Sequence, residues 1–159
     1  MRAAVSIGLM GSTDGTTLRA LAPRIERLGF DALWLNDVPG GDSLAGLRGV
    51  AGVTGRLRLA TGVIPLDRRP AATLDLTGLP ADRTAIGIGS GRAPHPLGLV
   101  EAAVASLRTV TDAAIVVGAL GRRGREPVEQ HPVGLLGREP PHPRAEGTDD
   151  DRGIRHRSR

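Results

Sequence analysis

The sequence lacks cysteine and lysine altogether, and its only aromatic residues are Phe30 and Trp34. Without cysteine, neither a disulfide framework nor a thiolate metal site is available. Without lysine, there is no Walker A phosphate loop, because that motif requires the residue. Stacking platforms for single-stranded nucleic acids need aromatic side chains, and no basic recognition helix stands out. We therefore expect no nucleic-acid partner.

Long apolar runs are also missing from the 159 residues. No segment approaches the ~18 apolar residues that a membrane-spanning helix needs. The short apolar run after Met1 is broken by Ser6, Gly8 and Gly11, which is unlike a signal peptide. We therefore expect no membrane partner and a cytoplasmic location.

What is present is a repeated alternation of strand-like and helix-like segments. Buried-type strands joined by helical crossovers form a parallel sheet. A regular repeat favours a barrel over a doubly wound sheet, although a complete barrel has eight units. The predicted fold is α/β, a partial TIM-type barrel of about five parallel strands with four helices. The strands are expected at 3–9, 31–35, 57–63, 84–88 and 113–119, with midpoints at Ser6, Leu33, Leu59, Ile86 and Ile115.

The helices are predicted from apolar positions at helical spacing. The first has Thr16 or Thr17 as its cap, and the second covers 44–53. The third, after Pro70, is short, and the fourth covers 100–107. In the barrel, the midpoint side chains of the strands are expected to point inward, among them Ser6, Leu33, Leu59 and Ile86.

The alternation ends near Gly121. We expect residues 1–121 to form the incomplete barrel and residues 122–159 to be a disordered tail. That segment is rich in arginine and proline, and its few apolar residues cannot offset the entropy of ordering. A shifted reading frame after Gly121 is the alternative. The four histidines have no metal-ligand spacing, so we expect no metal site; they are His95, His131, His142 and His156.

Four segments, in order, resemble the luciferase-like flavin- and deazaflavin-dependent oxidoreductases. They are Leu-Ala-Pro-Arg-Ile-Glu-Arg-Leu-Gly-Phe-Asp-Ala-Leu-Trp-Leu-Asn-Asp (21–37), Arg-Leu-Arg-Leu-Ala-Thr-Gly-Val-Ile-Pro-Leu-Asp-Arg-Arg-Pro (56–70), Ile-Gly-Ile-Gly-Ser-Gly (86–91) and Val-Val-Gly-Ala-Leu-Gly (116–121). The resemblance implies a TIM-type barrel that binds FMN or an 8-hydroxy-5-deazaflavin coenzyme at the carboxyl ends of its strands. It also implies a monooxygenase or reductase with a small-molecule substrate.

The same resemblance implies the site residues. Asp37, at the exit of the second strand, is the expected catalytic residue, and it would orient the substrate. The resembling family has a non-proline cis peptide bond in a bulge of the third strand, behind the cofactor ring, and for Gly62–Val63 both cis and trans are open. The expected cofactor-binding residues lie at the exits of the second and fourth strands and in this bulge, and they are Asn36, Thr61, Gly62, Val63, Gly89, Ser90 and Gly91.

Two departures from the family pattern leave a second reading open. Val38 stands where many members have a histidine, and the later strands that hold the cofactor phosphate are not in the sequence. The alternative function is a catalytically inactive half-barrel or interaction fragment, which could self-associate through exposed strand edges. For Asp67, Arg68 and Arg69, an anion clamp and a solvated loop are both open.

Overall fold

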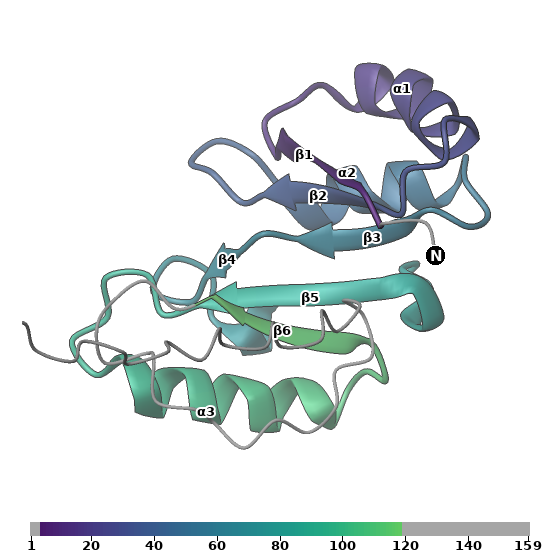
Figure 1. Cartoon of the computed structure of the whole chain (residues 1–159). Coiled ribbons are helices and arrows are strands. Elements are labelled where there is room, and N and C mark those ends of the chain that lie inside the picture. Colours follow the sequence, from purple (N-terminus) through teal and green to yellow (C-terminus); the bar gives the residue numbers. More distant parts are fainter. Residues whose placement is uncertain (1–3, 119–159) are drawn as a thin grey trace, which may run out of the picture.

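A parallel sheet organises the computed structural model, which describes residues 4–118 (Figure 1). The main strands follow one another across the sheet in chain order, and a two-residue strand, β4, pairs with β5. The predicted order of five parallel strands is therefore confirmed. The strands are β1 (Ser6–Met10), β2 (Ala32–Asn36), β3 (Arg58–Thr61), β4 (Ile64–Pro65), β5 (Thr84–Gly89) and β6 (Ala114–Gly118).

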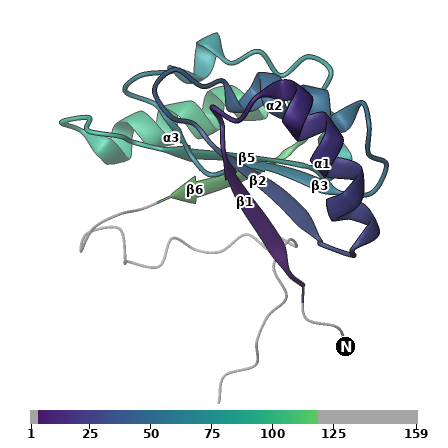
Figure 2. The same ribbon diagram turned by 90° about the horizontal axis from the view of Figure 1, so that it is seen from above.

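Three α-helices lie on one face of this sheet (Figure 2): α1 (Gly15–Arg27), α2 (Ser43–Ala51) and α3 (Pro96–Arg108). The crossover between β3 and β5 contains only two short 3-10 turns, η1 (Ala71–Thr73) and η2 (Ala81–Arg83). The predicted third α-helix was wrong, because the proline and glycine residues of this short segment leave no room for a second helical turn.

The N-caps of α1 and α2 are acidic side chains. The carboxylate of Asp14 accepts a hydrogen bond from the backbone N–H of Thr17 at 2.9 Å, so α1 begins at Gly15. The predicted cap at Thr16 or Thr17 was therefore wrong, and both residues lie inside the first turn. Asp42 caps α2 by accepting two backbone hydrogen bonds. Each cap satisfies N–H groups that the helix itself cannot pair.

The apolar core fills the space between the helices and one face of the sheet. Ile7, Leu33 and Leu59 are in register on neighbouring strands, and they pack against α1 and α2. Ile86 belongs to a second cluster with residues of α3. Leu33, Leu59 and Ile86 therefore face the helices, and their predicted inward direction was wrong.

The physical reason is the strand period of two residues, which sends neighbouring side chains to opposite faces. Ser6 pairs with Ala32 and not with Leu33, so Ser6 lies on the other face of the sheet. We call this second face the inner face. It carries Ser6, Gly8, Met10, Trp34, Asn36, Gly87 and Gly89.

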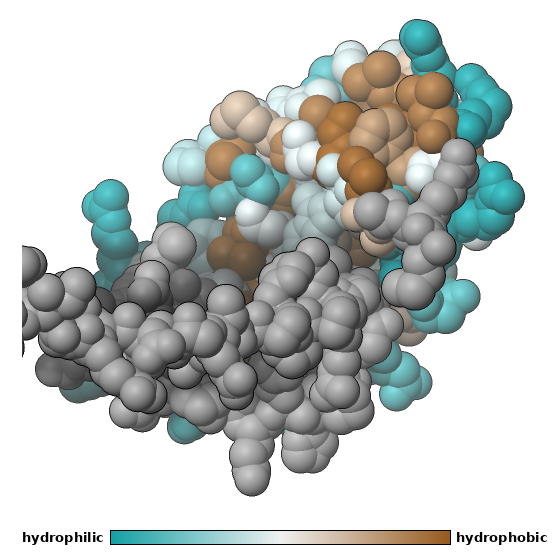
Figure 3. Space-filling model, in the orientation of Figure 1, coloured by the Kyte–Doolittle hydropathy of each residue, from teal (hydrophilic) through white to brown (hydrophobic). Residues whose placement is uncertain are grey.

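Exposed apolar side chains accompany this arrangement. Val5 and Met10 are 55% and 56% exposed at the two ends of β1, and Leu28 after α1 is 76% exposed. In the space-filling view, hydrophobic residues gather over the part of the molecule that holds α1 and β1 (Figure 3). The edge strand β1 is thus less well covered than the central strands β2, β3 and β5.

Candidate functional site

The candidate site lies where β2, β3 and β5 end, since parallel strands bring their carboxyl ends to one edge of a sheet. Gly62 follows β3 and donates its N–H to the carbonyl of Leu35 at 2.9 Å. A Cβ atom at Gly62 would lie 3.1 Å from Cε3 of Trp34 and 3.5 Å from Oδ1 of Asn36. The backbone at Gly62 therefore rests against the indole and the amide of the inner face.

The chain bulges immediately after β3. The Gly62–Val63 peptide bond is cis, as the resemblance implies. The side chain of Val63 lies above glycines of β5 and β6. A Cβ atom would lie 2.9 Å from a Val63 methyl at Gly89 and at Gly118, and 3.4 Å from one at Gly87. These three glycines make the space that Val63 occupies.

Thr61 lies beneath the bulge and is fully buried. Its hydroxyl donates to the carbonyl of Gly87 at 2.9 Å and accepts the N–H of the same residue at 2.8 Å. The side chain thus joins β3 to β5 at a point where the bulge interrupts the backbone pairing. The hydroxyl of Thr61 thus hydrogen-bonds to Gly87 of the protein itself. Gly62 and Val63 follow Thr61 and form the bulge that leads to the carboxyl edge.

Asp37 is the buried centre of an ionic cluster. Its side chain is 1% exposed, and its Oδ1 atom accepts hydrogen bonds from Nη1 of Arg69 at 2.7 Å and from the hydroxyl of Ser43 at 2.9 Å. Nη1 of Arg69 also lies 3.2 Å from Oδ1 of Asp42. Arg68 donates to the backbone carbonyl of Asp37 at 2.8 Å. The cluster fastens the loop after β4 to the loop after β2.

The electrostatics of this cluster favour the ionised form of Asp42. Partial burial by itself raises the pKa of Asp42, but the N–H of Ala45 and the guanidinium of Arg69 hold that pKa below its ordinary value. A carboxylate that caps a helix and faces an arginine stays charged at neutral pH. The same guanidinium nitrogen of Arg69 also contacts the carboxylate of Asp37.

The exit of β5 is fixed by a third acidic residue. The backbone N–H of Arg92 donates to Oδ2 of Asp67 at 2.9 Å. Gly91 has a φ of +62° beside the same carboxylate, a conformation that glycine adopts at little cost. Asp67 and Arg68 are exposed, as a solvated loop would have them, and all three residues also bind protein groups.

The predicted site residues thus separate into two groups. Asn36, Gly62, Val63 and Gly89 meet at the carboxyl edge of the inner face, with half-buried Ser90 next in the chain. Asp37, Thr61 and Gly91 are engaged in contacts that hold the surrounding loops. The sequence reasoning missed the residues whose role depends on partners far along the chain, namely Trp34, Gly87, Gly118 and Arg69.

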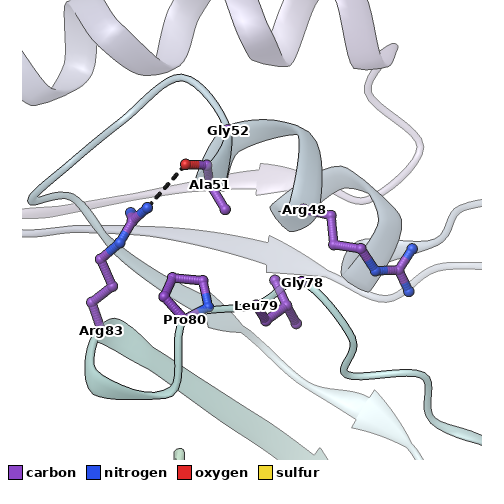
Figure 4. A pocket seen from close by; sticks show the side chains of 7 residues that line it. All are labelled: Arg48, Ala51, Gly52, Gly78, Leu79, Pro80 and Arg83. Carbon is purple, nitrogen blue, oxygen red and sulfur yellow. Dashed lines mark hydrogen bonds between the residues drawn. The ribbon is translucent and has the colours of Figure 1, made fainter.

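A shallow hollow of about 510 Å³ lies at the opposite edge of the sheet, between the end of α2 and the turn η2 (Figure 4). Its two arginines point away from each other. Arg83 donates to the carbonyl of Ala51 at 3.0 Å, and Arg48 forms an ion pair with Asp75. Nε of Arg48 is buried without a partner. Both guanidinium groups bind groups of neighbouring segments, and neither points into the hollow.

Some predictions concern residues beyond this site. His95 is exposed at the residue before α3, whereas His131, His142 and His156, together with the predicted tail 122–159, lie outside the described residues. Within residues 4–118, no three metal-ligating side chains of the His, Cys, Asp or Glu type come together. No helix in the same part of the chain has the length and apolar character to cross a membrane.

Comparison with solved structures gives a partial likeness. The coenzyme F420-dependent tetrahydromethanopterin reductase from Methanopyrus kandleri is 19% identical over the matched region, with a TM-score of 0.47. The match covers 68% of this chain and 30% of the reductase chain, so this chain spans less than a third of that protein's length. No curated protein sequence matches the chain significantly.

The comparison with protein families covers most of the chain. The family described as luciferase-like monooxygenase matches residues 3–131, which include every strand and helix of the described structure. The parallel strand order and the bulge after β3 agree with the resemblance seen in the sequence. The chain belongs to the luciferase-like monooxygenase family.

Proposed function

We propose that the protein is a flavin- or deazaflavin-dependent oxidoreductase that acts on a small-molecule substrate. The observation that carries the proposal is the surface at the carboxyl edge of the inner face. There, the Val63 side chain packs over the glycines of β5 and β6, and the backbone of Gly62 rests against Trp34, so the bulge forms an apolar surface at the strand exits. A planar ring can approach this surface closely at Gly62, because no Cβ atom projects from that residue.

The residues fit the ring portion of FMN or of an 8-hydroxy-5-deazaflavin. Val63 and the Gly62 backbone would support one side of the ring. The exposed amide of Asn36 and the hydroxyl of Ser90 would hydrogen-bond to its polar edge. When bound, the cofactor would supply hydride transfer. The protein would hold the ring, exclude water from one side of it and leave the other side open to the substrate.

In this proposal, Asp37 has an indirect role. Its carboxylate is 1% exposed and accepts hydrogen bonds from Arg69 and Ser43, so it acts on other residues rather than on a ligand. A catalytic role for Asp37, as expected from the resemblance, stays a prediction. Asn36, the preceding residue in the chain, is the better candidate for direct contact because its side chain is exposed.

The proposal is tested by binding and turnover. Purified protein is titrated with FMN and, separately, with the deazaflavin coenzyme, and binding is followed by visible absorbance and by quenching of Trp34 fluorescence. Asn36→Ala should bind about 3- to 10-fold more weakly, which corresponds to the loss of one ordinary hydrogen bond. Ser6→Ala, at the other end of the inner face, should bind as the wild type does. If neither cofactor binds, the proposal is wrong.

The alternative is a catalytically inactive module that associates through its edge strands. Within residues 4–118, β1 pairs only with β2 and β6 only with β5, so each has one free edge. Binding of cofactor without hydride transfer, or concentration-dependent assembly without binding, would favour this function over the oxidoreductase.

A further inference from the structure

We infer that Arg69 is a positioning residue for the ring site, because it clamps the loop after β4 to the loop after β2 and so fixes the bulge at Gly62 and Val63. The effect of this clamp on a bound ring rests on the proposed function. Its effect on the bulge itself does not, and can be measured without a cofactor.

The Arg69–Asp37 contact of the clamp is short and shielded from solvent, whereas the side chain of Asp42 is 51% exposed. One nitrogen of Arg69, Nη1, lies 2.7 Å from Oδ1 of Asp37 and 3.2 Å from Oδ1 of Asp42. The side chain of Arg69 is only 25% exposed, and that of Asp37 is 1% exposed. Charged hydrogen bonds that are removed from water are stronger and more directional than exposed ones. The positions of the two loops are therefore coupled through a single guanidinium group.

The clamp is connected to the bulge by a short, rigid path. The backbone N–H of Arg69 donates to the carbonyl of Pro65 at 3.0 Å, and the N–H of Leu66 donates to the carbonyl of Gly89 at 2.8 Å. Ile64 pairs with β5. The chain between Val63 and Arg69 is thus held to β5 at one end and to Asp37 at the other.

On its other side, the bulge is in contact with the exit of β2. Asp37 follows Asn36 directly, and a Cβ atom at Gly62 would lie 3.5 Å from Oδ1 of Asn36. A Cβ atom at Gly62 would lie closer still, 3.1 Å, to Cε3 of Trp34, two residues earlier on the same strand face. The exit of β2 therefore meets the bulge directly, through the Leu35 carbonyl and the side chains of Trp34 and Asn36, and indirectly through Asp37 and Arg69. Loss of Arg69 would remove the indirect connection and let the bulge move relative to Trp34.

The test uses Trp34, the only tryptophan of the protein, as a reporter of the bulge. Arg69→Ala is compared with Arg83→Ala. Arg83 also binds several backbone carbonyls, yet it lies at the opposite edge of the sheet. Because Arg69→Ala leaves the Asp37 carboxylate without its cation, the double variant Arg69→Gln/Asp37→Asn is made as well. It removes both charges together and keeps an oxygen that can accept from Ser43.

All variants are measured at a temperature at which circular dichroism shows them folded. Both Arg69 variants should show increased acrylamide quenching and a red-shifted emission of Trp34, whereas Arg83→Ala should match the wild type. Their affinity for FMN or the deazaflavin coenzyme should fall by about tenfold or more, equivalent to about 1.4 kcal/mol.

The other outcomes would contradict either the inference about Arg69 or the proposed function. Unchanged Trp34 emission and quenching in folded Arg69 variants would overturn the inference, and so would equal changes in Arg83→Ala. If the wild type binds no cofactor, the proposed function fails, while the Trp34 measurements still decide whether Arg69 positions the bulge. If cofactor binds equally well to all variants, Arg69 does not position the ring site.

Discussion

The hydroxyl of Thr61 takes the place of a backbone group in its pairing with Gly87, donating to the carbonyl at 2.9 Å and accepting the N–H at 2.8 Å. The next backbone N–H, that of Gly62, continues the pairing of β3 with β2 by donating to the carbonyl of Leu35. Without the Thr61 hydroxyl, both polar groups of Gly87 would be buried and unpaired. This side chain therefore lets the bulge exist inside an otherwise continuous sheet.

Replacement of Thr61 by valine should destabilise the protein by about 2–4 kcal/mol, because two buried backbone groups of Gly87 lose their partner. The two side chains have nearly the same shape, so the change removes the hydrogen bonds and little packing. Urea denaturation followed by circular dichroism measures the difference. Thr61→Ser keeps the hydroxyl and is the matched control, expected to lose much less stability. Equal stability of the valine and serine variants would refute the role of the hydroxyl.

Replacement of Gly89 by alanine should cost about 1–3 kcal/mol, because the new methyl would lie 2.9 Å from Cγ2 of Val63. The cost arises from overpacking, so removal of the Val63 methyls should relieve it. The double variant Gly89→Ala/Val63→Ala should be more stable than the sum of the single changes predicts, by about 1 kcal/mol.

Gly8 provides the control for this experiment. It lies on the same face of the sheet, but no atom lies within 4 Å of a Cβ at this position. Gly8→Ala should therefore leave stability nearly unchanged. Additive effects of the Gly89 and Val63 substitutions in thermal or urea unfolding would show that the two residues do not compete for this space.

Glu26 should make stability depend on pH. Its Oε1 accepts the backbone N–H groups of Gly55, Arg56 and Leu57 at 3.0, 2.6 and 2.7 Å. The hydrogen bond from Arg56 contributes most, and the pKa of Glu26 lies below its ordinary value of 4.5. A lowered pKa in the folded state means that the stabilisation is complete above pH 4.5 and is lost as the pH falls through the folded value.

Glu26→Gln is expected to be less stable than the wild type by about 1 kcal/mol at neutral pH, a value kept small because the carboxylate is largely exposed to solvent. The difference should shrink as the pH is lowered below 4.5. Glu101→Gln, at an exposed position of α3, serves as the control. Urea unfolding at several pH values measures the effect. A stability difference that is constant from pH 7 to pH 3 would contradict this account.

The monomeric chain is not expected to turn over substrate. Within the described residues, β1 and β6 each have a free edge, and the inner face carries the exposed Met10 beside Asn36. A cofactor held from one side only should bind weakly. Size-exclusion fractions are assayed for hydride transfer from the reduced cofactor, and sedimentation velocity at several concentrations gives the assembly state. Turnover by a monomer with micromolar or tighter cofactor affinity would contradict the prediction.

The sequence by itself determined the alternation of strands and helices, their order and the polar edge. These features follow from local patterns, such as the apolar stripe of α3 and the glycines and polar residues after β2 and β5. The parallel order follows because each crossover is short and returns the chain to the same edge of the sheet. The family resemblance then pointed to the bulge at Gly62 and Val63.

Only the tertiary structure decided which face of the sheet each strand residue occupies and what the polar residues bind. A register difference of one residue places Ser6 and Leu33 on opposite faces, and no local pattern fixes such an offset. The partners of Thr61, Arg69 and Val63 are Gly87, Asp37 and Gly118, each more than 25 residues away in the chain. Such pairings depend on how whole strands are laid side by side, so composition and spacing along the sequence do not specify them.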